Sequence, residues 1–111
     1  MEDEAFLRAL ESCLLPASEF GHAAHVRAAY LYLRGAELDV AIDNVRRTLQ
    51  RYVAHLGCAD RYDETMTKAY MAIIHRRMVE KGDAGGWAEF ARANQDLFTI
   101  RRLTAHASLR P

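Results

Sequence analysis

The chain has 111 residues, a length that suits one domain over residues 1–111 and leaves no room for separate cofactor and substrate domains. Its 15 Lys and Arg residues balance its 15 Asp and Glu residues, so neither a nucleic acid nor a membrane surface is expected as a partner. The two cysteines, the acidic N-terminus and the lack of a long apolar run argue against a disulfide framework and a membrane span, and they favour a cytoplasmic protein.

Glycine and proline are sparse and fall between segments of helical periodicity. This pattern predicts an all-α fold, a single helical bundle of four main helices with a short fifth helix and a C-terminal tail. The first helix is expected over residues 4–15, and Pro16 should end it. Ser18 is the expected N-cap of the second helix, which should stop where Gly35 can take a left-handed conformation.

The third helix is expected over residues 38–56, with its apolar side chains in one stripe, its arginines opposite them and Gly57 at its end. Asp60 should cap a fourth helix over residues 60–81. A short fifth helix is expected over residues 87–93. From residue 97 onward the sequence predicts one or two weak helical turns and a basic tail.

The second helix carries a pair of histidines and almost no polar face, which predicts that it lies at the centre of the bundle. His22 and His25 are three residues apart, so a helix places both imidazoles on the stripe that contains Val26, Ala29 and Leu33. An unsatisfied polar group in a core costs about 1–3 kcal/mol. The two rings are therefore expected to have a hydrogen-bond partner, a metal or a catalytic task.

The fourth helix also brings polar side chains onto an apolar stripe, Glu64 and Thr67 near its start. In an up-down-up-down bundle the second and fourth helices run parallel, so their starts lie at the same end. This arrangement predicts an enclosed site in which His22, His25 and Glu64 converge.

Three interpretations of this cluster stay open. Two imidazoles and a carboxylate suit a divalent transition metal such as zinc, iron or manganese, with His22, His25 and Glu64 as ligands. Without a metal, a desolvated Glu64 would have a raised pKa, and it or a histidine could act as a general base with Thr67 nearby. In the third interpretation the same side chains only hydrogen-bond to one another and fix the register of the helices.

An enclosed pocket between helices predicts a small-molecule ligand or substrate, contacted by Arg27, Tyr30, Tyr62 and Asp63. An enzyme of this kind would be a lyase, isomerase or hydrolase that works by proton transfer or hydrolysis. Nicotinamide redox chemistry is not expected, because the sequence has neither a glycine-rich loop nor a sheet. The alternative is a non-catalytic binding module, in which the apolar surface and the tyrosines of the second helix mediate a homodimer.

Two sequence motifs contain these residues. The first, F-x-H-x-x-H-apolar-R-x-A, runs from Phe20 to Ala29, and the second, Y-D-E-T-M-T, runs from Tyr62 to Thr67. Both resemble motifs of a group of short bacterial helical proteins, in which the second motif reads Y-H-E-T-apolar-T. The resemblance implies that the two histidines and the glutamate form a functional site. It also implies that Asp63 stands in place of a third histidine, where it could bind a hard metal or accept a proton.

Overall fold

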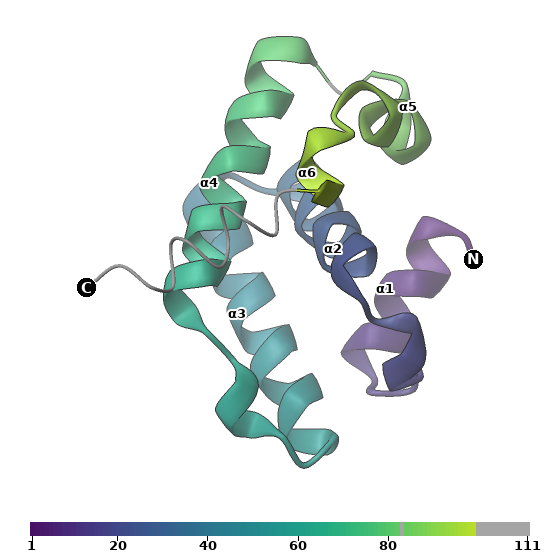
Figure 1. Ribbon diagram of the computed structural model, residues 1–111, viewed down its shortest axis with the longest axis vertical. Coiled ribbons are helices and arrows are strands. Elements are labelled where there is room, and N and C mark those ends of the chain that lie inside the picture. Colours follow the sequence, from purple (N-terminus) through teal and green to yellow (C-terminus); the bar gives the residue numbers. More distant parts are fainter. Residues whose placement is uncertain (83, 100–111) are drawn as a thin grey trace.

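The computed structural model describes residues 1–82 and 84–99, and it shows an all-α domain without a β-strand among these residues (Figure 1). The predicted basic tail, residues 100–111, lies outside the described residues. In the described part of the chain, six α-helices and two 3₁₀ turns follow one another: α1 (Asp3–Glu11), η1 (Ala17–Glu19), α2 (His22–Gly35), α3 (Leu38–His55), η2 (Ala59–Arg61), α4 (Glu64–Lys81), α5 (Gly86–Ala93) and α6 (Asp96–Thr99).

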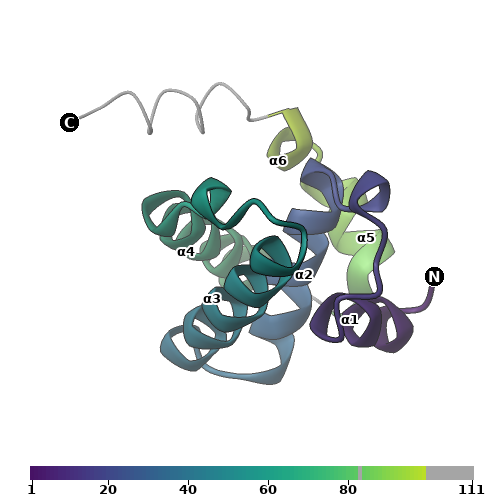
Figure 2. The same cartoon turned by 90° about the horizontal axis from the view of Figure 1, so that it is seen from below.

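Helix α2 occupies the centre, in contact with α3, α4, α5 and α6 (Figures 1 and 2). Helices α2 and α4 run in roughly the same direction, and α3 runs in the opposite direction (Figure 1). The starts of α2 and α4 therefore lie at the same end of the bundle, as the up-down-up-down arrangement predicted. Within the described part of the chain, no helix combines the length and the apolar character needed to cross a membrane.

Helix α2 is covered on its apolar faces by the chain itself. On one side, the fully buried Tyr30 packs against Trp87 and Phe90, with ring centroids 5.5 and 4.7 Å away. On the other side, a second cluster joins α1 to α2 and α3, and the buried Tyr52 donates a hydrogen bond to the Leu15 carbonyl oxygen at 2.7 Å. Much of the apolar surface of α2, including Tyr30, is thus covered by other parts of the same chain.

Helix α1 ends at Glu11, four residues before the predicted end, and Pro16 is not the cause. Cys13 adopts a left-handed conformation with φ of 62°. The amides of Leu14 and Leu15 turn back to the Ala9 carbonyl oxygen, at 2.8 and 3.0 Å. These bonds satisfy the end of the helix before the proline is reached.

The boundaries of α2 also differ from the prediction. Ser18 lies in the turn η1 and caps nothing, and α2 begins at His22 after Gly21, without a side-chain cap. Gly35 is the last helical residue, and it is not among the glycines with a positive φ. The second helix is therefore shorter than expected, and His22 stands in its first turn.

Helix α4 begins later than predicted. Asp60 belongs to the turn η2, and Tyr62, which follows that turn, has an extended backbone. The N-cap is Asp63, whose Oδ1 accepts a hydrogen bond from the Met66 amide at 3.0 Å. This cap is worth about 0.5–2 kcal/mol. As predicted for α3, a left-handed glycine follows its C-terminus, Gly57 with φ of 78°.

Met71→Ala tests the packing of α4 onto α2. Met71 is 1% exposed, so its truncation leaves a cavity in the core and should lower the free energy of unfolding by about 2–5 kcal/mol. The measurement is chemical denaturation followed by circular dichroism. Val79→Ala on the same helix is the matched control, because Val79 is 70% exposed and its truncation should change stability by less than about 0.5 kcal/mol. Equal losses in the two variants would contradict this packing.

Candidate functional site

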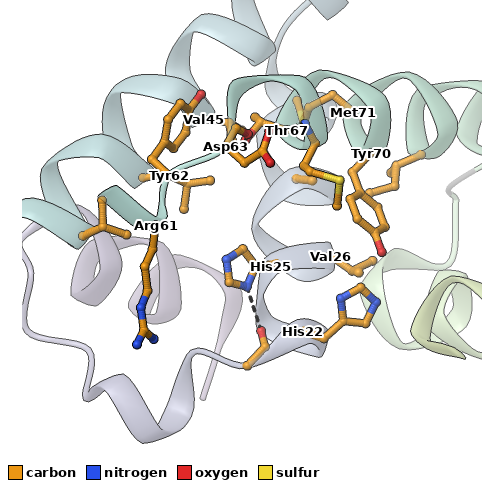
Figure 3. A pocket seen from close by; sticks show the side chains of 16 residues that line it. His22, His25, Val26, Val45, Arg61, Tyr62, Asp63, Thr67, Tyr70 and Met71 are labelled. Carbon is orange, nitrogen blue, oxygen red and sulfur yellow. Dashed lines mark hydrogen bonds between the residues drawn. The ribbon is translucent and has the colours of Figure 1, made fainter. Parts of the chain in front are cut away.

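A pocket of about 650 Å³ lies between the start of α2, the C-terminal half of α3 and the start of α4 (Figure 3). Most of its wall is apolar and comes from these three helices: Val26, Ala29, Val45, Leu49, Val53, Met66, Met71 and Ile74. Its polar side chains come from α2, from α4 and from the segment before α4: His22, His25, Arg61, Tyr62, Asp63, Thr67 and Tyr70. An apolar cavity with a few converging polar groups is the usual form of a small-molecule site.

His25 has one ring nitrogen committed to the backbone and the other available. Its Nδ1 lies 3.0 Å from the Gly21 carbonyl oxygen (Figure 3). Because a carbonyl oxygen only accepts, Nδ1 must carry the proton, and the neutral ring then has its lone pair on Nε2. The ring also lies against Phe20, with centroids 4.0 Å apart.

The pKa of His25 is lowered below its ordinary value of 6.5. Burial of the ring is the largest cause. The hydrogen bond to the Gly21 carbonyl oxygen is the next largest and raises the pKa, while the nearby His22 has the smallest effect and lowers it. The residue as a whole is exposed to solvent, but its ring lies in the wall of the pocket, and the lowered pKa keeps the imidazole mostly neutral at pH 7.

His22 is tied to a distant part of the chain. Its Nε2 donates a hydrogen bond to the carbonyl oxygen of the buried Leu97 at 2.8 Å, and its ring meets that of Tyr70 edge to face with centroids 5.4 Å apart. Helix α6 is itself held by Arg77 of α4, whose Nη2 lies 2.6 Å from an Asp96 carboxylate oxygen. His22 thus joins the first turn of α2 to α6 and at the same time lines the pocket.

The carboxylate of Glu64 was predicted to share a space with the two histidines, and the structure places it elsewhere. It does not line the pocket. Arg46 of α3 binds the carboxylate of Glu64, with Nε 3.0 Å from each carboxylate oxygen and Nη2 2.7 Å from Oε2. Tyr62 donates to Oε1 at 2.6 Å, and Lys68 lies 3.4 Å from Oε2.

The same contacts reverse the expected shift of the Glu64 pKa. Hydrogen bonds from Arg46, and then from Tyr62, hold the pKa of this carboxyl at about 2, whereas desolvation alone would raise it. Glu64 is therefore ionised throughout the neutral range and committed to an ion pair. It is not a poised acid or base.

The three side chains predicted as metal ligands are not brought together. In residues 1–82 and 84–99, no three His, Cys, Asp or Glu side chains lie close enough to hold a metal ion. His22 and His25 line the pocket, while the carboxylate of Glu64 binds Arg46. The ligand set expected for zinc, iron or manganese thus lacks its carboxylate in this geometry.

Three other predicted contacts do reach the pocket, although each has a local hydrogen bond. The Tyr62 hydroxyl is committed to Glu64, and Asp63 uses Oδ1 to cap α4. The Thr67 hydroxyl donates to the Asp63 carbonyl oxygen at 2.8 Å, which leaves its oxygen able to accept. Asp63 and Thr67 therefore offer further acceptors beside His25.

Arg27 and Tyr30, the other predicted substrate contacts, do not line the pocket. Arg27 turns toward α1, where Nη2 donates to the Met1 carbonyl oxygen at 2.6 Å and to Asp3 Oδ1 at 2.7 Å. Its guanidinium also lies over the Phe6 ring, 4.7 Å from the centroid. Tyr30 is fully buried in the core. The physical reason is helical phase, because both residues lie on other sides of α2 than the histidines.

Sequence reasoning missed Tyr70 and Arg61, which also line the pocket. Tyr70 follows Thr67 by three residues, so their shared helical face could have revealed it. Arg61 has no such signal, because its position depends on the turn η2, which occupies part of the predicted helix.

Comparisons of the chain with protein-family models, with curated proteins and with solved structures found no match.

Glu64→Gln tests the separation of the ion pair from the pocket. The pKa of Glu64 is lowered from 4.5 to about 2, so the charged carboxylate stabilises the fold fully above about pH 4.5, and this contribution is lost as the pH falls toward 2. Wild type should thus be more stable than Glu64→Gln at neutral pH, and the difference should shrink on acidification. Denaturant unfolding at a series of pH values measures it.

Glu80→Gln on the same helix is the control for Glu64→Gln. Glu80 makes an exposed ion pair with Arg76 at 3.8 Å, so its neutralisation should have almost no effect on stability. The NMR titration of His25 should be the same in Glu64→Gln as in wild type. A large change in that titration would show that the carboxylate and the imidazole act together after all.

Proposed function

We propose that the protein binds a small, mostly apolar molecule in the pocket between α2, α3 and α4, and that His25 accepts a proton from it. The observation that carries this proposal is the state of the His25 ring in the wall of an apolar cavity of about 650 Å³. Its tautomer is fixed by the Gly21 carbonyl oxygen, and its pKa is lowered, so Nε2 is an available base at neutral pH.

The local geometry supports both states that a general base must adopt. Burial disfavours the imidazolium and keeps the resting ring neutral. When Nε2 takes a proton, the Nδ1–H donor remains bonded to the Gly21 carbonyl oxygen, which favours the charged form. The proton leaves an acidic O–H or C–H group of the ligand, or a water that attacks it, and its electron pair stays on that atom. A lyase, isomerase or hydrolase reaction would begin in this way.

The partners of the other polar residues support a division of roles. His22 is held by Leu97 and Tyr62 by Glu64, so both shape the wall. The oxygens of Thr67 and Asp63 can accept hydrogen bonds from a ligand. The acceptors of the pocket thus favour a molecule with one or two donors on an apolar body.

The titration of His25 gives a direct test. The midpoint of its ring protons in NMR should fall below 6.5, because burial lowers the pKa. Since the pKa in the folded state is below that of the unfolded chain, the neutral ring contributes stability above about pH 6.5 that is lost as the pH falls through the folded-state pKa. His25→Phe should therefore lose less stability than wild type on acidification. A midpoint at or above 6.5 would remove the proposed base.

Ligand binding can be tested with phenol and anisole, which share a ring but differ in the hydroxyl donor. Both should shift the NMR signals of pocket residues in wild type. His25→Phe keeps an aromatic ring on Phe20 but loses the acceptor, so the affinity for phenol should fall about two- to tenfold while that for anisole stays unchanged. An equal effect on the two ligands would contradict a role for Nε2.

A matched pair of valines on α3 controls for the place of binding. Val53 lines the pocket, and Val53→Trp should fill part of it and abolish binding of both ligands. Val40 is 48% exposed and lies outside the pocket, so Val40→Trp should bind both as wild type does. Binding that survives Val53→Trp would place the ligand elsewhere and refute the proposed pocket.

A further inference from the structure

Two charged side chains, Asp63 and Arg61, line the pocket in addition to the histidines. They differ in whether a partner within the chain neutralises their charge. Asp63 caps α4, so its carboxylate accepts from the Met66 amide and lies at the positive end of the helix dipole. Arg61 is exposed, and no carboxylate in the described ranges 1–82 and 84–99 pairs with it. The pocket therefore has an unmatched positive charge and a locally matched negative one.

The other arginines around the core set Arg61 apart. Arg27, Arg46 and Arg77 each bind a carboxylate at 2.7 Å or less, namely Asp3, Glu64 and Asp96. These arginines join helices to one another. Among the described residues Arg61 has no such carboxylate partner, although it lines the pocket.

The turn η2 holds the backbone of Arg61 at the outer edge of the pocket, and its side chain is exposed. Its amide donates to the Cys58 carbonyl oxygen at 2.9 Å, which closes the turn η2. Figure 3 shows the guanidinium at the edge of the site, directed away from His25. The charge is thus directed away from the proposed base, in a pocket whose wall is otherwise mostly apolar.

We infer that the ligand is an amphipathic carboxylate, with its apolar body in the cavity and its carboxylate at the mouth beside Arg61. This inference rests on the proposed function and adds the chemical class of the ligand. A guanidinium is well suited to a carboxylate, because its N–H groups can donate to both oxygens. The volume of about 650 Å³ lies in the range of ordinary small-molecule sites.

Octanoate and 1-octanol are the probes, because they share an apolar chain and differ in charge. Their affinities are compared by NMR titration of wild type and Arg61→Gln at low ionic strength. An exposed ion pair is worth about 0.2–1 kcal/mol, so octanoate should bind Arg61→Gln up to about fivefold more weakly than wild type. The affinity for 1-octanol should not change. The difference for octanoate should shrink in about 1 M salt, where screening is strong.

Two variants complete the experiment. Arg61→Lys keeps the charge and should restore most of the affinity for octanoate. Arg8→Gln removes an exposed arginine of α1 outside the pocket, and it should bind both probes as wild type does. If octanoate binds Arg61→Gln as tightly as wild type, the inference of a carboxylate ligand beside Arg61 is overturned. Binding of 1-octanol would in that case still support the pocket. If neither probe shifts the signals of pocket residues, the proposed function fails with it.

Discussion

The structure depends on the burial of α2, a helix whose sequence has almost no polar face. Such a helix is stable only when other elements cover it, and here α3, α4, α5 and α6 contact it while α1 closes a second cluster. Covering it with helices that run up and down places the starts of α2 and α4 at one end. The pocket lies where these two starts and α3 meet, and the first turn of α2 brings both histidines to it.

Two ion pairs of the protein connect helices and lie outside the pocket. Arg46 with Glu64 and Arg77 with Asp96 connect separate helices, and their carboxylates have lowered pKa values because they are paired. None of these four residues lines the pocket. The wall that remains is mostly apolar, so the shift of the His25 pKa is due mainly to burial. Because Glu64 does not line the pocket, no ion pair with its carboxylate offsets the effect of burial on the imidazole.

Helical periodicity predicted the elements well and their ends less well. Helix α3 was expected over residues 38–56 and runs from Leu38 to His55, because its apolar stripe and the following glycine are local signals. The end of α1 depends on the left-handed Cys13, for which the sequence offers no signal. The start of α4 depends on which of two aspartates caps it, and both fit the pattern.

The candidate site was predictable where one helix determines it and unpredictable where two helices must meet. The phase of His22 and His25 on the stripe with Val26 follows from their spacing, and all three line the pocket. The position of the Glu64 carboxylate depends on Arg46, which helical periodicity predicted to lie on the solvent face of its helix. A long arginine side chain at the border of two helices can reach a carboxylate on its neighbour, and no pattern within one helix reveals this.

The two histidines illustrate how a shared helical face can serve different purposes. The His22 ring nitrogen binds the carbonyl oxygen of Leu97, 75 residues away, so this histidine holds α6 against the start of α2. The corresponding bond of His25 is made to Gly21 within its own helical turn, and it fixes a tautomer without joining another element. Because His22 also lines the pocket, the position of α6 is linked to the shape of the site. Any movement of the His22 ring would have to loosen its bond to Leu97, so this histidine resists rearrangement of the wall, whereas the bond of His25 leaves the rest of the wall unconstrained.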